Sequence, residues 1–99
     1  MRYPTCTILQ SLTSVSEAMF LQEQVVNLIH RRIWQPDIMD MFRKGTTQEI
    51  IVSERTVVQL QGLLYKGNPV GMIEVRGYLE GRLVQKFPLS CRDLDCYLN

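Results

Sequence analysis

The alternation of apolar and polar residues in the last third of this chain constrains its fold more than any other feature. Residues 70–78 and 82–89 both alternate, and the segment Leu79-Glu80-Gly81 lies between them. A period of two is typical of a strand with one buried face, and two such runs around a glycine predict a β-hairpin. The pattern also predicts which side chains share a face of the sheet.

The register of this hairpin depends on the length of its loop. A two-residue turn at Glu80-Gly81 would oppose Val75 to Lys86 and mix polar with apolar residues on both faces. A three-residue loop over Leu79-Glu80-Gly81, with Gly81 as a left-handed bulge, separates them, and we therefore expect it. The buried face then carries Gly77/Leu83, Val75/Gln85, Ile73/Phe87 and Gly71/Leu89. The outer face carries Tyr78/Arg82, Arg76/Val84, Glu74/Lys86 and Met72/Pro88.

A third strand is expected immediately upstream. The segment Lys66-Gly67-Asn68-Pro69 is dense in turn residues, and a four-residue loop there pairs Tyr65 with Val70. The same buried face then gains Val58, Leu60, Gly62 and Leu64. Agreement between two turns favours a strand through residues 54–65. The alternative is a helix over these residues, capped by Ser53 and ended by Gly67.

Length and composition bound the remaining possibilities. The 99 residues suffice for one domain, residues 1–99, and 45% apolar residues are typical of a folded protein. A net charge of +1 gives no overall attraction to nucleic acid or to an anionic membrane. No apolar run is long enough to span a bilayer, and the first residues lack the apolar region of a signal peptide. We therefore expect a cytoplasmic protein.

The cysteines do not indicate a metal site. Cys6, Cys91 and Cys96 are odd in number and show no CxxC spacing. Because the chain has one histidine, a zinc site would need carboxylates to complete it, which is uncommon. We expect free thiols, no metal and no cofactor.

Two helices are expected before the sheet. The segment Ser14-Val15-Ser16-Glu17 fits a capping box, and a long amphipathic helix should follow to about Ile33. Its apolar stripe comprises Ala18, Leu21, Val25, Leu28, Ile29 and Ile33. Pro36 then suits the start of a second, short helix that Gly45 ends, with Ile38, Met41 and Phe42 on its apolar side.

Shorter elements are expected at three further places. Residues 5–9 alternate weakly and predict a short strand, and residues 49–53 predict a buried one. Ser90 and Asp93 fit a helix cap, so a terminal helical turn toward Leu98 should dock Leu94 on the core.

One candidate functional surface is apolar. On the outer face of the sheet lie Leu63, Tyr65, Met72 and Val84. Phe20, Asn27 and Trp34 recur every seven residues on the side of the first helix opposite its core stripe. Such exposed residues are typical of a contact with another protein. The alternatives are that the same chain covers the outer face, and that Trp34 lies beyond the end of the helix and folds back on the turn at Pro36.

The other candidate surface is basic. Arg76, Arg82 and Lys86 are expected beside Tyr78 on the outer face. Basic side chains around an aromatic ring are typical of single-stranded nucleic-acid binding, in which charges follow phosphates and the ring stacks on a base. The alternative is an ordinary polar sheet surface, because Glu74 dilutes its positive charge.

Together these features predict an α+β domain. A long N-terminal amphipathic helix and a short helix should pack on one face of a three- to four-stranded antiparallel meander. We expect a small non-enzymatic protein–protein interaction or regulatory module, because no nucleophile motif accompanies the single histidine. Open sheet edges and a partly apolar outer face favour a homodimer, because such surfaces are usually paired or covered. A single-stranded nucleic-acid-binding protein is the alternative, and no membrane contact is expected.

Overall fold

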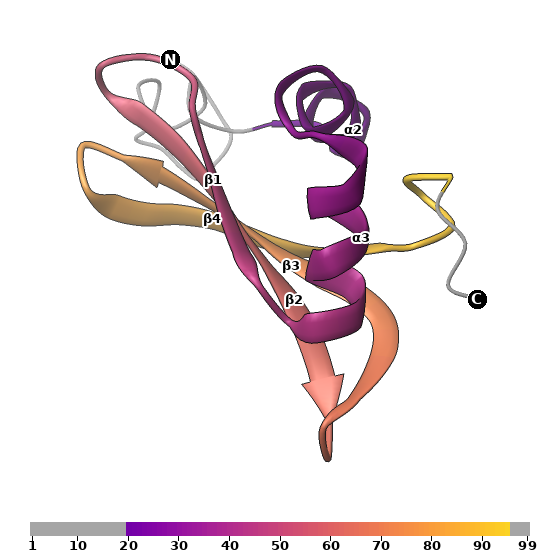
Figure 1. The fold of residues 1–99 in the computed structure, drawn as a ribbon. Helices are drawn as coiled ribbons and strands as arrows, with labels where there is room; N and C mark the ends of the chain where they lie inside the picture. The colour runs from indigo at the N-terminus through magenta and orange to yellow at the C-terminus, as the bar shows by residue number, and fades with distance from the viewer. Residues whose placement is uncertain (1–19, 96–99) are drawn as a thin grey trace.

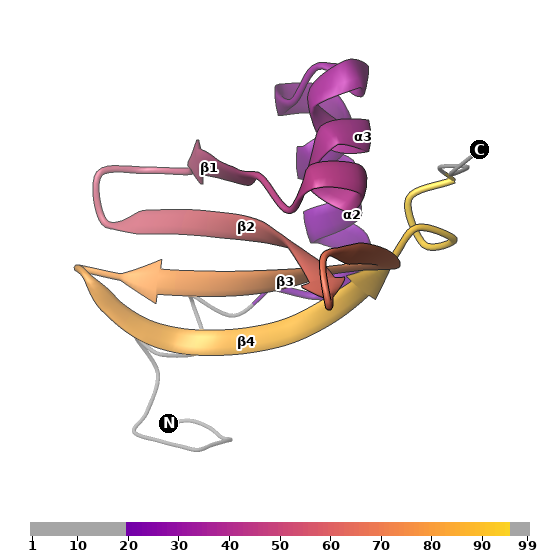
Figure 2. The same cartoon turned by 60° about the horizontal axis from the view of Figure 1, so that its bottom comes forward.

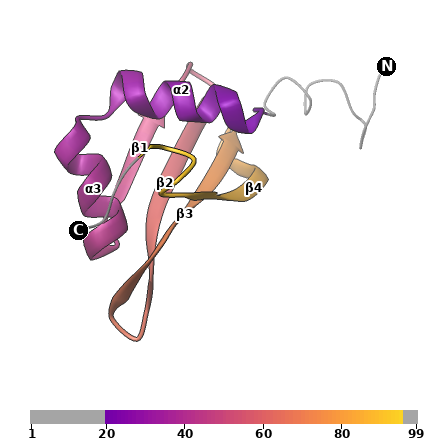
Figure 3. The same cartoon turned by 90° about the vertical axis from the view of Figure 1, so that its right-hand side faces the viewer.

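The computed structural model describes residues 20–95. The helices α2 (Gln22–Arg32) and α3 (Gln35–Lys44) precede the strands β1 (Thr47–Ile51), β2 (Thr56–Tyr65), β3 (Asn68–Leu79) and β4 (Arg82–Ser90). The strands form one antiparallel sheet in chain order, which Figure 1 shows beside the helices. Both helices lie on the same face of the sheet (Figure 2 and Figure 3). The expected α+β class and antiparallel meander are therefore confirmed.

The hairpin of β3 and β4 closes with a two-residue turn, and the expected three-residue loop is wrong. Leu79 opposes Arg82, while Glu80 and Gly81 have φ values of 49° and 80°, as a type I′ turn requires. Beyond Tyr78, which opposes Leu83, the register shifts so that Gly77 opposes Gln85. Val84 is left as the extra residue of a β-bulge.

This bulge explains why the predicted faces are right along most of the hairpin although the predicted pairs are wrong. Val75 opposes Phe87 and Ile73 opposes Leu89, each two residues from the expected partner. A shift of two residues is one full period of a strand, so residues 73–77 and 85–89 keep their expected faces. Next to the turn, Leu83 and Val84 do not.

The hairpin of β2 and β3 has the predicted register through most of its length. Gly62 opposes Ile73 and Leu60 opposes Val75, which confirms a strand and contradicts the alternative helix. The turn, however, contains two residues, Lys66-Gly67, so the expected four-residue loop is wrong. The register shifts by two residues between Gly62 and Leu64, which is why the pairs on the side of Gly62 away from the turn are still those predicted. On β3, Gly71 has a φ of 74° in this irregular stretch.

The core lies between the helices and the inner face of the sheet. Helix α3 begins with Pro36 in its first turn and ends at Gly45, whose φ is 72°, as predicted. The buried residues are Val25, Ile29, Ile33, Ile38, Met41, Phe42, Ile50, Val58, Leu60, Ile73, Val75, Leu89 and Leu94. The predicted apolar side of α3 is thus confirmed.

The first described helix is shorter than expected. Leu21 is extended, with φ and ψ of −74° and 151°, so α2 begins at Gln22 and has 11 residues. A long-range contact accompanies this late start: the Phe20 N–H donates to Oε1 of Gln85 (2.8 Å), and Nε2 of Gln85 donates to the Phe20 carbonyl (2.7 Å). The predicted cap at residues 14–17 and strand at residues 5–9 lie outside the described residues.

The last turn of α3 lies against the backbone of β2 at Gly62. A Cβ atom on Gly62 would lie 1.6 Å from the carbonyl oxygen of Met41 and 2.9 Å from the Cα of Gly45. Glycine is therefore required here, because a side chain would occupy the space of the last turn of α3.

The chain after β4 turns back onto the core. The Ser90 N–H donates to a carboxylate oxygen of Asp93 (2.8 Å), and the Asp93 N–H donates to Oγ of Ser90 (3.1 Å). The bond from the Ser90 N–H lowers the pKa of Asp93 below its usual range. Leu94 is fully buried, as predicted, whereas Leu98 lies outside the described residues.

Candidate interaction surface

The face of the sheet opposite the helices, here called the outer face, is crossed by three rows of opposed residues. No helix among residues 20–95 lies on it (Figure 2). The apolar row comprises Ile51, Val57, Tyr78 and Leu83. The charged row comprises Glu49, Gln59, Arg76 and Lys86, and the third row comprises Thr47, Gln61, Glu74 and Pro88. Each row takes one residue from every strand.

The apolar row is the least expected part of this face. Ile51 is 66% exposed and Leu83 is 50% exposed, at the two ends of the row, while Val57 and Tyr78 are half-buried between them. Leu83 was expected on the inner face, but the bulge at Val84 moves it opposite Tyr78. The adjacent apolar pair Leu83-Val84 breaks the alternation and was the signal of this bulge.

The charged row is organised around Arg76. Its guanidinium donates to the side-chain oxygens of Gln59 (2.9 Å), Gln61 (3.0 Å) and Glu74 (2.6 Å). Glu74 also forms an ion pair with Lys86, whose Nζ lies 3.5 Å from the second carboxylate oxygen of Glu74. The hydrogen bond from Arg76 lowers the pKa of Glu74 below its usual range and keeps it ionised. The positive charge of Arg76 is thus matched within the chain.

The predicted basic cluster is brought together only in part. Arg76, Tyr78 and Lys86 share the outer face, as expected. Arg82, expected opposite Tyr78, instead opposes Leu79 at the turn, and its placement on the outer face is wrong. Two acidic residues, Glu49 and Glu74, lie among the basic ones.

The predicted apolar residues of the outer face are also separated. Leu63 and Met72 are half-buried at the end of the face away from the apolar row, and Tyr65 is exposed beside the Lys66-Gly67 turn. Val84 is the bulge residue of the β3–β4 ladder, and it lines a hollow beside Phe20. These four residues therefore do not form one patch.

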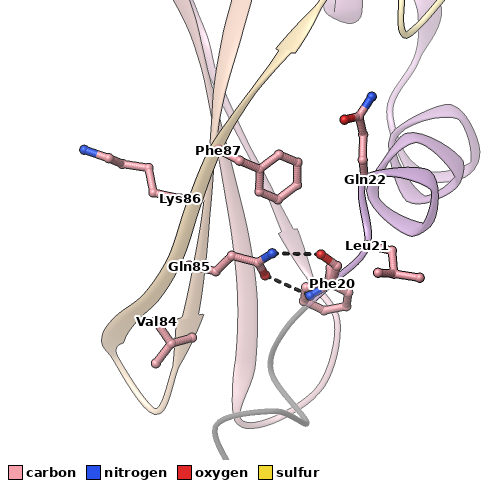
Figure 4. Close-up of a pocket in the computed structure, with 7 residues that line it drawn as sticks. All are labelled: Phe20, Leu21, Gln22, Val84, Gln85, Lys86 and Phe87. Atoms are coloured by element: carbon pink, nitrogen blue, oxygen red, sulfur yellow. Dashed lines mark hydrogen bonds between the residues drawn. The ribbon is translucent and has the colours of Figure 1, made fainter. Parts of the chain in front are cut away.

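Phe20 and Trp34 do not lie on one face of a helix, because both flank α2. Phe20 precedes α2 and lines a hollow of about 550 Å³ between the start of that helix and β4. Figure 4 shows Gln85 and Phe87 pointing toward Phe20, while Lys86 points to the other side of β4. Trp34 is the N-cap of α3 and is 71% exposed. The predicted aromatic face is therefore wrong, and the part of the alternative that places Trp34 beyond the end of the helix is confirmed.

A second, smaller hollow lies on the other side of Phe20. It has a volume of about 280 Å³, and its lining includes Phe20, Asn27, Arg31 and Val52. Phe20 and Asn27, two members of the predicted heptad series, thus come together although Trp34 does not join them.

Each edge of the sheet has one backbone position that is not available to an added strand. The N–H of Cys91 donates to the carbonyl of Gly71 on β3 (2.8 Å). Because the backbone groups of alternate residues face β3 in an antiparallel ladder, those of Pro88 face away from the sheet, and proline has no N–H to offer a further strand. On β1, Nη1 of Arg32 donates to the carbonyl of Ile51 (3.3 Å).

Comparison with known proteins gives no further guide to function. No protein-family model, curated protein sequence or solved structure matches the chain. Within residues 20–95, no group of three His, Cys, Asp or Glu side chains is placed to hold a metal ion. No helix of this part of the chain is long and apolar enough to cross a membrane. Burial raises the pKa of the Cys91 thiol.

Proposed function

We propose that this protein is a small non-enzymatic protein–protein interaction module that self-associates through the outer face of its sheet. The observation that carries the proposal is the apolar row, which crosses all four strands on the face that the helices leave open. A contiguous apolar patch rimmed by polar residues is typical of an interaction site.

The apolar row can supply a useful part of the association energy. Ile51 and Leu83 expose 66% and 50% of their surface, so their burial would contribute roughly 1 kcal/mol each in either copy. Tyr78 and Val57 add contact area between them. The loss of translational and rotational freedom opposes this gain, so we expect a dimer of modest affinity.

The charged row favours a protein partner over nucleic acid. The guanidinium of Arg76 already donates to Gln59, Gln61 and Glu74, which leaves it poorly available to a phosphate. Two acidic residues balance the two basic residues of the three rows, whereas nucleic-acid sites carry an excess of positive charge. These hydrogen bonds also hold the side chains in place before a partner arrives, which lowers the entropic cost of binding.

Sedimentation equilibrium tests the proposal. The wild type should sediment as a dimer at high protein concentration, and Leu83→Asp should sediment as a folded monomer because the interface would bury an unpaired charge. Trp34→Asp is the matched control, since Trp34 is 71% exposed off the outer face and aspartate is a good N-cap.

Three outcomes would contradict the proposal. A wild type that stays monomeric at every concentration refutes self-association. Equal masses for Leu83→Asp and the wild-type dimer place the contact elsewhere. Salt-sensitive binding to a single-stranded oligonucleotide, lost in an Arg76→Ala, Lys86→Ala variant, would favour the nucleic-acid-binding alternative.

A further inference from the structure

We infer that two copies pack outer face to outer face around a two-fold axis parallel to the strands, so that Glu49 of each copy meets Lys86 of the partner subunit. This inference rests on the proposed self-association and adds its arrangement. Two-fold dimers are the commonest homo-oligomers, and in them one surface patch must complement itself. Two sheets packed face to face keep their strands nearly aligned, which this axis allows.

The axis brings each row against the same row of the partner in reverse order, because it exchanges β1 with β4 and β2 with β3. In the apolar row, Ile51 then faces Leu83 of the partner subunit, and Val57 faces Tyr78 of the partner subunit. The apolar side chains of both copies are thereby covered along the whole width of the sheet.

The charges of the outer face complement each other in the same arrangement. Glu49 and Lys86 occupy opposite ends of the charged row, so the reversal places one against the other twice in the dimer. Within residues 20–95 no cation lies in ion-pair distance of Glu49, and the Lys86 side chain is 58% exposed. In the third row, Gln61 meets Glu74 of the partner subunit as an amide donor to a carboxylate.

A two-fold axis perpendicular to the strands does not give this match. If it passes through the charged row, Glu49 faces itself, Arg76 faces itself and Lys86 faces itself, and like charges opposed in an interface are unfavourable. If it passes through the apolar row, the charged rows of the two copies extend to opposite sides and do not meet. The observed distribution of charge therefore favours the parallel axis.

Complementation between two charge-reversed variants tests this arrangement. In a dimer of the Glu49→Lys variant, a positive side chain at position 49 faces Lys86 of the partner subunit at both contacts. In a dimer of the Lys86→Glu variant, a negative side chain at position 86 faces Glu49 of the partner subunit at both contacts. Because two attractive pairs become repulsive in each case, the dissociation constant should rise roughly tenfold or more for either variant. In an equimolar mixture, mixed dimers with one copy of each variant can form. The Glu49→Lys copy then carries positive charges at positions 49 and 86, and the Lys86→Glu copy carries negative charges at both. Each of the two contacts between the copies therefore joins opposite charges again. Such mixed dimers should form with near the wild-type affinity.

Two control variants isolate the effect of charge at this site. Glu23→Lys on α2 and Lys66→Glu at the β2–β3 turn make the same changes away from the charged row, and their mixture should dimerise like the wild type. Complementation also excludes a purely intrachain effect, such as loss of the contact between Lys86 and Glu74, because mixing cannot restore an intrachain pair.

The possible results separate this inference from the proposed function. Weakened single variants and a restored mixture support both. A wild-type dimer that Leu83→Asp disrupts, but whose charge-reversed variants do not complement each other, preserves the proposed function and overturns the arrangement. A monomeric wild type, including one in which the chain's own residues cover the outer face, overturns both.

Discussion

Replacement of Gly62 by alanine should be among the most damaging small changes in this protein. The added Cβ would lie 1.6 Å from the Met41 carbonyl oxygen and 2.5 Å from the Met41 carbonyl carbon. Both are backbone atoms, so no side-chain rotation relieves the overlap. Ordinary van der Waals contact begins near 3.4 Å, so the last turn of α3 must move by about 1.8 Å from β2.

The expected cost follows from what that movement uncovers. Met41 and Phe42 lie in this turn and are fully buried, so a displaced α3 loses much of their packing. Removal of one such side chain costs about 2–5 kcal/mol, and we expect Gly62→Ala to cost about 3–5 kcal/mol. This is a large part of the roughly 5–15 kcal/mol that stabilises a typical domain.

Urea unfolding followed by circular dichroism measures this cost. Gly67→Ala is the control, because no atom lies within 4 Å of its Cβ position and its penalty comes from a φ of 81° alone. We expect about 1 kcal/mol for that variant. The single tryptophan, Trp34, caps α3 and should report a change in its surroundings in Gly62→Ala at zero denaturant. Equal unfolding free energies for the two variants would refute the close contact between α3 and β2.

Three further outcomes follow from the two turns and from the contact between Arg76 and Glu74. Gly81→Val should lower the unfolding free energy by about 1–3 kcal/mol and Gly81→Asn by less, since φ at Gly81 is 80°; equal thermal melts would contradict the left-handed conformation. Lys66→Asn should raise the unfolding free energy by about 0.5–1 kcal/mol, because asparagine before glycine suits a type I′ turn and the φ of Lys66 is 52°; a lower melting temperature would count against this turn. The lowered pKa of Glu74 means that its stabilising contribution is complete above the usual pKa of a glutamate and is lost as the pH falls through the lowered value. Glu74→Gln should therefore flatten the acid side of the stability–pH profile, and an unchanged acid side would show that Arg76 contributes nothing through this carboxylate.

The sequence predicted the faces of the central strands better than it predicted their pairing. Alternation specifies on which side of the sheet a residue lies, and a three-residue loop gives the same sides as a two-residue turn followed by a bulge. The faces of Ile73 and Val75 were therefore predictable, whereas their partners Leu89 and Phe87 were not. The alternation of apolar and polar residues cannot reveal a register shift of two residues, because such a shift leaves every side chain on the same face.

The parts that the sequence did not predict depend on contacts between distant residues. The start of α2 accompanies hydrogen bonds between Phe20 and Gln85, which are 65 residues apart. The apolar row forms because Ile51 pairs with Val57 on the neighbouring strand and because the bulge moves Leu83 to the outer face. By contrast, α3 was predicted well, because its proline start and glycine end act within the helix itself.

The order of the strands has a consequence for how the chain folds. Every strand pairs with its neighbour in sequence, and both long hairpins close through two-residue turns, so no pairing joins strands that are separated by another strand in the chain. A low contact order gives fast folding for a sheet protein, because little chain entropy is lost before the first contacts form. We expect α3 to dock on the sheet after the sheet has formed. Substitutions in the Lys66-Gly67 turn should then act on the folding rate, whereas substitutions at the junction of α3 with β2 should act on the unfolding rate.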